Sequence, residues 1–378
     1  MDIIKVQNAR ERELFIRLPH TIYQNDTNWT PQFDFLIREK LDRKKNPFFE
    51  HGWAQELLAV ENGQPVGRLL VSDDERFNQE NNANYGMFGF FECVDDHKVA
   101  NALFDEGVRI LKVERKRDVV FGPVEFSTNY EYGLLIDGFD SPAKVMMSYN
   151  PPYYQSLIEG WGWEKNRDLF SWWFDRSALF ADNWRPIVER LRDRYQFTVR
   201  PFSLKDFKGD VSRCMQVYDH IRSEWWWGSV SLTDAEIKQY AQMLHQIAFP
   251  EMVLIAESSD GKPIGFSITI PDLNEAAKPL NGKTSWFGIP FLGLLRLKSR
   301  LKRVKGARLI VLCVLPEYRR KGVAENLIVN TFDFGYYKMK YENAELGWTD
   351  EYNDKISHVL ERVGARRFKK YRVYQKNI

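Results

Sequence analysis

The chain has 378 residues, of which 44% are hydrophobic and 15% aromatic, enough for two domains that each bury a core. The formal net charge of +2 argues against a strong general affinity for nucleic acid, although it leaves room for a local basic patch. The cysteines Cys93, Cys214 and Cys313 have no CxxC spacing and the six histidines form no HExxH pair. We therefore expect a reducing compartment and no metal. The first residues contain no apolar signal core, which predicts a cytoplasmic protein.

Two features of the first half of the chain return in the second half in the same order. Residues 57–73 and 253–272 share a G-x-P-x-G turn, and residues 157–174 resemble residues 359–376. Two aligned features at similar offsets predict two tandem units of similar architecture.

Domain boundaries follow from this repeat. We expect a first domain over 1–176, a linking helix over 177–196 and a second domain over 197–378. No low-complexity linker separates the units, so we expect them to dock rigidly across a shared interface.

Residues 121–154 are crowded with Gly, Pro, Asn and Tyr. Polar groups beside apolar ones suit an acceptor-binding cleft between the units, with Asn129 and Tyr153 as candidate contacts. The alternative is a structured loop whose tyrosines cap the core. Further along, Trp226 and Trp227 either line an apolar acceptor pocket or belong to the core.

The second half alternates strand and helix patterns. Asp260-Gly261 is a turn signal between two strands, and Thr233 with Glu236 has the spacing of a capping box. The patterns predict strands over 197–201, 252–257, 264–270, 308–315, 343–349 and 367–374, and helices over 206–225, 233–246 and 354–363.

A basic, apolar segment interrupts this order at 272–307. Its apolar part is too short to span a bilayer, and its leucines then fall at helical spacing between cations. Three interpretations are open: a helix that packs on the neighbouring domain, a lid over an acyl or acceptor pocket, and peripheral membrane contact through 286–305.

The most informative stretch runs from 309 to 332, where a buried strand, a basic turn and a helix follow one another. Backbone amides at the start of such a helix bind phosphate or pyrophosphate, because unpaired N–H donors and the positive end of the helix dipole converge there. The pattern is neither GxxxxGK[ST] nor GxGxxG. The turn residues are Arg319, Arg320, Lys321, Gly322, Val323 and Ala324.

This turn reads Arg319-x-x-Gly322-x-Ala324 and resembles the pyrophosphate signature of the GNAT superfamily, the GCN5-related N-acetyltransferases. The order of elements over 197–378 is similar to that family too. The segments PFFEH, GFFEC and YNPPYY are similar to those of a group of bacterial tandem GNAT proteins. The resemblance implies an α/β (α+β) fold of two tandem GNAT-like units, each a mixed, mostly antiparallel sheet flanked by helices.

The first unit departs from the pattern. Its counterpart region, 90–112, has Asp95 and Asp96 where a cationic glycine turn is expected. Two carboxylates would repel a pyrophosphate, so we expect only the second unit to bind the coenzyme.

The resemblance implies a co-substrate and its contacts. Acetyl-CoA is the default donor, a longer acyl-CoA stays open, and the six turn residues would hold its pyrophosphate. The thioester carbonyl would meet a backbone amide of Cys313, Val314 or Leu315. Asn353 would hydrogen-bond the coenzyme arm. Leu360 stands where the family often has the tyrosine that protonates the departing thiolate, which leaves the general acid open.

A general base is harder to place because the strand at 308–315 carries no carboxylate. Glu345 is the first candidate, since strand alternation turns it away from the faces of Ala344 and Leu346. Glu351 and Asp350, just beyond that strand, are alternatives. Glu345 could equally be a salt-bridged surface residue.

These inferences favour an acyl-CoA-dependent N-acyltransferase that transfers the acyl group directly to an amine of a small molecule or peptide. Two alternatives stay open: an aminoacyltransferase that uses charged tRNA, and a non-catalytic protein that binds acyl-CoA. The near-neutral charge gives tRNA little general attraction.

Overall fold

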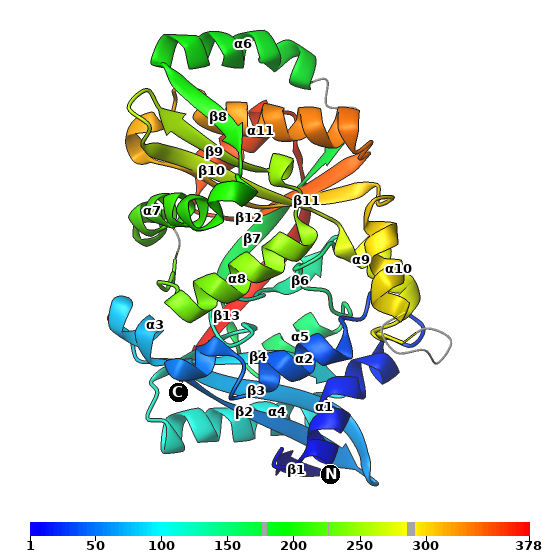
Figure 1. The fold of residues 1–378 in the computed structure, drawn as a ribbon. Coiled ribbons are helices and arrows are strands. Elements are labelled where there is room, and N and C mark those ends of the chain that lie inside the picture. Colours follow the sequence, from blue (N-terminus) through cyan, green and yellow to red (C-terminus); the bar gives the residue numbers. More distant parts are fainter. Residues whose placement is uncertain (176–179, 226, 286–291) are drawn as a thin grey trace.

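The computed structural model describes residues 1–175, 180–225, 227–285 and 292–378. Two halves lie one above the other, and one mixed sheet runs through both of them (Figure 1). The strands are β1 Asp2–Lys5, β2 Gly52–Glu61, β3 Gln64–Asp74, β4 Tyr85–Cys93, β5 Val119–Gly122, β6 Leu134–Asp137, β7 Glu164–Asp175, β8 Phe197–Pro201, β9 Val253–Ser258, β10 Pro263–Pro271, β11 Gly306–Val314, β12 Asn343–Asp350 and β13 Arg366–Asn377.

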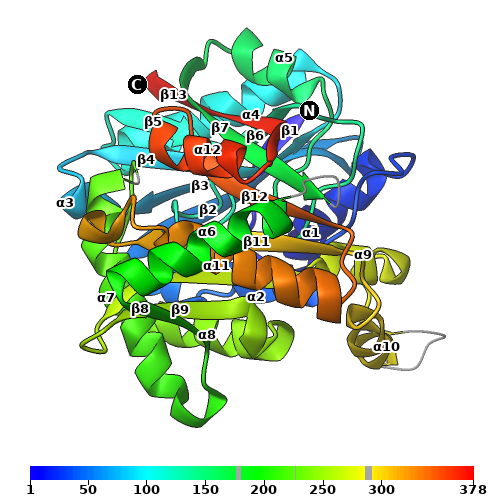
Figure 2. The same ribbon diagram turned by 90° about the horizontal axis from the view of Figure 1, so that it is seen from above.

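Helices cover both faces of this sheet. In the second half, α6 and α11 lie side by side over one face together with α12 (Figure 2), while α7 packs on the other face. The helices are α1 Ala9–Ile22, α2 Asp34–Leu41, α3 Glu75–Glu80, α4 His97–Arg109, α5 Tyr154–Gly160, α6 Phe180–Tyr195, α7 Phe207–Trp225, α8 Asp234–Ile247, α9 Leu273–Ala277, α10 Leu292–Leu301, α11 Val323–Asp333 and α12 Asp354–Arg362.

The strand order reveals that the halves exchange their last strands. The order is β1-β2-β3-β4-β5-β13-β7-β12-β11-β10-β9-β8. Strand β7, from the first half of the sequence, pairs antiparallel with β12, and β13, from the end of the chain, pairs antiparallel with β5. Each half contains one parallel pair, β4 with β5 and β11 with β12, bridged by a helix as a parallel connection requires. The two halves therefore have the same topology.

The predicted fold of two similar units is confirmed, and so are the elements of the second half. Strand β8 begins and ends as predicted, and the other strands and helices there agree to within a few residues. Thr233 and Glu236 form the predicted capping box at the start of α8. The helix α6 lies in the predicted linking segment. The domain boundaries stay a prediction. Dividing the chain at these boundaries would separate β12 from its partner β7 and β5 from its partner β13.

The interpretation of 272–307 as a packed helix agrees with α10. Its residues Leu297 and Leu301, followed by Val304, are buried against Phe33 and other apolar side chains. Of the wider predicted segment, residues 286–291 lie outside the described part of the chain. Among the described residues, none of the helices combines the length and apolarity needed to cross a bilayer.

A buried histidine joins the two halves. The Nδ1 atom of His51 lies 2.9 Å from an oxygen of Asp74, and its Nε2 atom lies 3.5 Å from an oxygen of Glu236 on α8. Burial alone would lower the pKa of His51, but its hydrogen bond with Asp74 and its charge interactions with both carboxylates raise it to about 9. The imidazolium is therefore the form that holds α8 against the first half.

This contact makes stability depend on pH. The folded-state pKa of His51 lies above its unfolded value of about 6.5, so the stabilisation is complete below about pH 6.5 and is lost as the pH rises through 9. We expect the free energy of unfolding to fall by roughly 3 kcal/mol over that interval. Urea unfolding across the pH series measures this fall. In a His51→Gln variant this contribution should be absent, so the fall over the same interval should be smaller by about 3 kcal/mol, and an equal slope in the variant would contradict the assignment.

Candidate coenzyme-binding site

The predicted pyrophosphate turn connects β11 to α11. After a short 3-10 helix, Pro316–Tyr318, the backbone of Arg320 and Gly322 takes positive φ angles of 66° and 83°. Gly322 is the residue that precedes the first turn of α11, and no side chain caps that turn. The first amides of a helix have no partner within the helix, so those of α11 are available to an anion at the positive end of its dipole.

Glycine is required at 322 for two reasons. A residue with a side chain is strained at φ 83°, and a Cβ there would lie 2.7 Å from the Cδ1 atom of Leu191 on α6. The same helix is tied to α11 by Asn326, whose amide donates to the carbonyl of Val188 at 2.8 Å. Helix α6 thus packs directly beside the amides that would bind the anion.

The corresponding position of the first half is closed. The carboxylate of Asp96 accepts a hydrogen bond of 2.7 Å from the amide of Lys98 and so caps α4. The anion position of α4 is filled by a carboxylate of the protein itself. This supports the expectation that the first half does not bind the coenzyme.

Strands β11 and β12 separate where a thioester would enter. They pair in parallel from Gly306 and Asn343 up to Leu309 and Leu346, and β11 then continues with β10 as its recorded neighbour. The β10–β11 pairing shifts register between Ile268 and Thr269, which leaves an extra residue in β11 at this point. Beyond Leu309 the backbones of these two central strands are thus unpaired with each other, which leaves a gap in the ladder.

Only one of the three predicted thioester contacts has a suitably directed amide. The amide of Leu315 donates to the carbonyl of Ile264 at 2.9 Å, toward β10. Backbone groups alternate along a strand, so the amide of Val314 points toward the gap and that of Cys313 toward β10. Burial also raises the pKa of the Cys313 thiol, which makes it a poor nucleophile.

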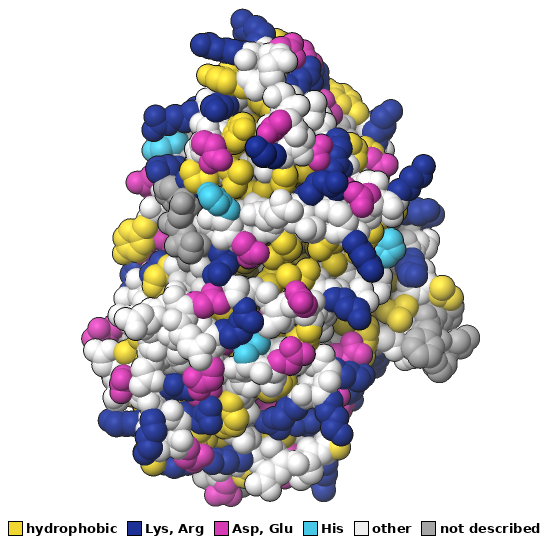
Figure 3. All heavy atoms as spheres, turned by 60° about the vertical axis from the view of Figure 1, so that its left-hand side comes forward, with side chains coloured by type: hydrophobic (Ala, Val, Ile, Leu, Met, Phe, Trp, Pro, Cys, Tyr) yellow, Lys and Arg dark blue, Asp and Glu magenta, His cyan; other side chains and the backbone are white. Residues whose placement is uncertain are grey.

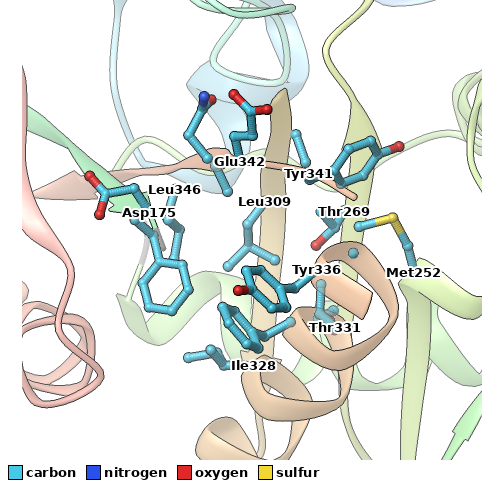
Figure 4. A pocket seen from close by; sticks show the side chains of 17 residues that line it. Asp175, Met252, Thr269, Leu309, Ile328, Thr331, Tyr336, Tyr341, Glu342 and Leu346 are labelled. Carbon is cyan, nitrogen blue, oxygen red and sulfur yellow. The ribbon is translucent and has the colours of Figure 1, made fainter. Parts of the chain in front are cut away.

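An apolar pocket begins at the last paired residues of β11 and β12 (Figure 4). It extends beneath α11 and is open to solvent at its mouth. Among its lining residues Leu309 and Leu346 are buried, while Tyr336 is partly exposed and Glu342 is exposed. The remaining lining residues are Phe174, Asp175, Met252, Ser267, Thr269, Ala307, Ile328, Thr331, Phe332, Gly335, Tyr341, Asn343 and Ala344.

Glu345 lies on the opposite face of the sheet from this pocket, as strand alternation predicts. It is fully buried and is the register partner of Arg308, whose guanidinium donates to the carbonyl of Val145 at 2.7 Å. Burial raises the pKa of Glu345, and Ser171 and Arg308 offset the increase only in part. The alternative of a salt-bridged surface residue does not fit a side chain that has no exposure.

The other candidate carboxylates are engaged in ion pairs. Glu351 lies 2.8 Å from Lys165, and Asp350 lies 2.7 Å from Arg167. The side chain of Asn353 accepts from the amide of Ile356 and so caps α12. In the same helix Leu360, at 2% exposure, fills the core beneath α12 in place of a polar general acid.

The predicted acceptor contacts lie where the halves meet or within the first half. Asn129 donates to the carbonyl of Val230, and Trp227 packs on Phe121 with ring centroids 5.2 Å apart. The hydroxyl of Tyr153 donates to the carbonyl of Cys93 at 2.8 Å. Trp226 lies outside the described residues. Sequence patterns alone indicated neither that α6 borders the predicted pyrophosphate turn nor that Val314 is the candidate whose amide points toward the gap between β11 and β12.

No protein-family model matches this chain. The chain is 33% identical over 379 residues to Protein YghO of Escherichia coli (strain K12), covering 98% of this chain and 94% of that protein. It is 30% identical over 380 residues to the bacterial ceramide synthase of Caulobacter vibrioides (strain NA1000 / CB15N), covering 100% of this chain and 97% of that protein. The chain belongs to the family of these two proteins.

Solved structures show the same fold at low sequence identity. A tandem GNAT protein from the clavulanic acid biosynthesis pathway superposes with a TM-score of 0.57 at 12% identity and covers 100% of this chain and 98% of that one. A GCN5-related glucosamine N-acetyltransferase region in a fungal multi-domain GH3 β-N-acetylglucosaminidase gives a TM-score of 0.58 at 11% identity and covers 99% of this chain and 38% of that longer one. The fold is therefore the GNAT fold, present twice.

Replacing Gly322 by valine should weaken CoA binding by roughly a hundredfold, because about two charge-assisted hydrogen bonds to the pyrophosphate would be lost. Isothermal titration with CoA measures the change. Gly261→Val is the matched control, since Gly261 also has a positive φ, 77°, with open space around a Cβ. Both variants should lose some stability, and only Gly322→Val should lose affinity. Equal CoA affinity in the two variants would refute the role of Gly322.

Proposed function

We propose that this protein is an acyl-CoA-dependent N-acyltransferase that joins a long acyl chain to the amine of a long-chain amino alcohol. The uncapped start of α11 carries the proposal, because its free amides and basic turn suit the pyrophosphate of CoA. The contrast with the self-capped α4 supports a single coenzyme site in the second half.

The lipid character of the substrates is supported by two further observations. One full-length relative is named a bacterial ceramide synthase, and a ceramide is a long-chain amino alcohol with a fatty acyl group on its nitrogen. The pocket beneath α11 begins at Leu309 and Leu346, beside the gap where the thioester would lie. The apolar lining of the pocket at that point suits the methylene groups of an acyl chain, so we propose a long-chain acyl-CoA over the acetyl-CoA default.

The reaction needs an oriented thioester, a deprotonated amine and a donor for the tetrahedral oxyanion. The amide of Val314 would donate to the carbonyl oxygen. The amine nitrogen then attacks the carbonyl carbon, the C–S bond breaks, and the thiolate takes a proton from water. The proton of the amine passes through water to Glu345, a carboxylate whose pKa is raised by burial.

A direct assay tests this function. We expect the purified protein to release CoA thiol from palmitoyl-CoA in the presence of sphinganine and to form the N-acyl product, as detected by mass spectrometry. Ile328→Trp, which fills the pocket from α11, should lower kcat/KM for palmitoyl-CoA by roughly tenfold or more and affect acetyl-CoA much less. Val359→Trp is the control, because this partly buried α12 residue does not line the pocket.

The assay separates the alternatives. Acyl-CoA binding without thiol release across a panel of amines would favour a non-catalytic binding protein. Absence of acyl-CoA binding, together with transfer from charged tRNA, would favour the aminoacyl route. If Ile328→Trp and Val359→Trp had the same ratio of kcat/KM for palmitoyl-CoA to kcat/KM for acetyl-CoA, the result would contradict binding of the acyl chain in the pocket.

Glu345→Gln should lower kcat by about a hundredfold while leaving CoA affinity unchanged, because the isosteric amide cannot take a proton. In the wild-type enzyme the rate should rise with pH through the raised pKa of Glu345, and the variant should lack this dependence. A pH profile of kcat under saturating substrates measures it. A variant with the wild-type profile would leave Glu345 as a structural partner of Arg308.

A further inference from the structure

The segment 276–316 differs in charge from the rest of the chain. It contains nine Lys or Arg residues and no Asp or Glu, whereas the whole chain has a net charge of only +2. The remainder of the chain is therefore net negative. On the face drawn in Figure 3, cations and anions are interspersed. Such a concentration of one sign is costly through self-repulsion and points to an anionic partner.

Helix α10 presents part of this charge on an outward face. Its inward residues Leu297 and Leu301 are buried with Phe33, which fixes the orientation of the helix. Leu295 is 66% exposed, and the exposed Lys298 and Lys302 follow it one and two turns later. Residues three and seven positions apart share a helix face. The outer face of α10 therefore combines an exposed leucine with a row of cations, continued by the exposed Arg303 and Lys305.

This face lies beside the mouth of the apolar pocket. The carbonyl of Lys305 accepts from the amide of Glu342 at 2.7 Å, and the Nζ atom of Lys305 lies 3.1 Å from the Glu342 carboxylate. Glu342 itself lines the pocket. Ala307 and Tyr341, which also line it, pack in the same apolar cluster as Leu297. Figures 1 and 2 show α10 at the periphery of the molecule.

We propose that the outer face of α10 docks on an anionic lipid bilayer and holds the mouth of the pocket at the membrane surface. Lysine and arginine side chains meet the anionic headgroups, while Leu295 enters the boundary with the acyl chains. An exposed leucine within the cationic row suits a lipid surface better than a nucleic acid, whose phosphates offer it no apolar contact. The proposal goes beyond the acyl transfer and does not depend on it, because docking requires neither coenzyme nor acceptor.

Vesicle co-sedimentation of the full-length protein tests this docking. We expect binding to phosphatidylcholine vesicles that contain phosphatidylglycerol and little binding to pure phosphatidylcholine, with a strong decrease at high salt. Charge reversal at Lys298, Lys302 and Arg303 to glutamate should weaken binding roughly a hundredfold, since each basic residue near an anionic surface contributes about 1 kcal/mol. Leu295→Ser should weaken it by a smaller factor.

Matched controls keep the interpretation specific. Charge reversal of Lys44, Lys98 and Lys112, exposed cations of the first half, changes the net charge equally and should leave vesicle binding nearly intact. Equal loss in both triple variants, equal binding to neutral vesicles, or no binding to anionic vesicles would each overturn the proposal. Release of the bound protein by duplex RNA at lower concentration than by soluble anionic lipid would overturn it in favour of nucleic acid. Far-ultraviolet circular dichroism verifies that each variant is folded.

Discussion

The exchange of β7 and β13 is the constraint on which the rest of the molecule depends. Phe174 of β7 pairs with Ala344 of β12, and Tyr374 of β13 pairs with Gly122 of β5, so each half receives its last strand from the other. Separating the halves would expose the edges of both sheets, which is costly in water. The halves therefore share one continuous sheet, and Glu345 is enclosed where they meet.

The two halves have one topology but differ at the first turn of the helix that bridges their parallel strands. In the first half, Asp96 supplies a carboxylate to the start of α4, and this internal anion satisfies amides that a pyrophosphate would otherwise bind. In the second half, Gly322 supplies no side chain, and α11 starts uncapped. The same helix dipole thus stabilises a protein group in one half and is available to a ligand in the other. The first half, whose helix start is already capped, then supports the second half structurally.

The sequence predicted what depends on local patterns. Gly322 and the cations around it were sufficient to place the turn. The alternation of side chains along β12 was sufficient to orient Glu345. Long-range pairings carry no local signal, so the strand exchange and the contact of Leu191 with Gly322 were not foreseen. The same reason applies to His51, whose two carboxylate partners come from β3 and α8. Composition leaves two interpretations of Tyr153 open, an acceptor cleft and a loop that caps the core, and its hydroxyl donates to the carbonyl of Cys93 within the first half.

The central claim is that CoA binds at the amides that start α11 and leaves those of α4 untouched. Amide hydrogen exchange with and without saturating CoA measures both sites in one experiment, since each amide reports its own protection. The account predicts new protection at residues 320–325 and along β11 beyond Leu309, with no change at the first turn of α4. Protection at α4, or none at 320–325 under saturation, would contradict it.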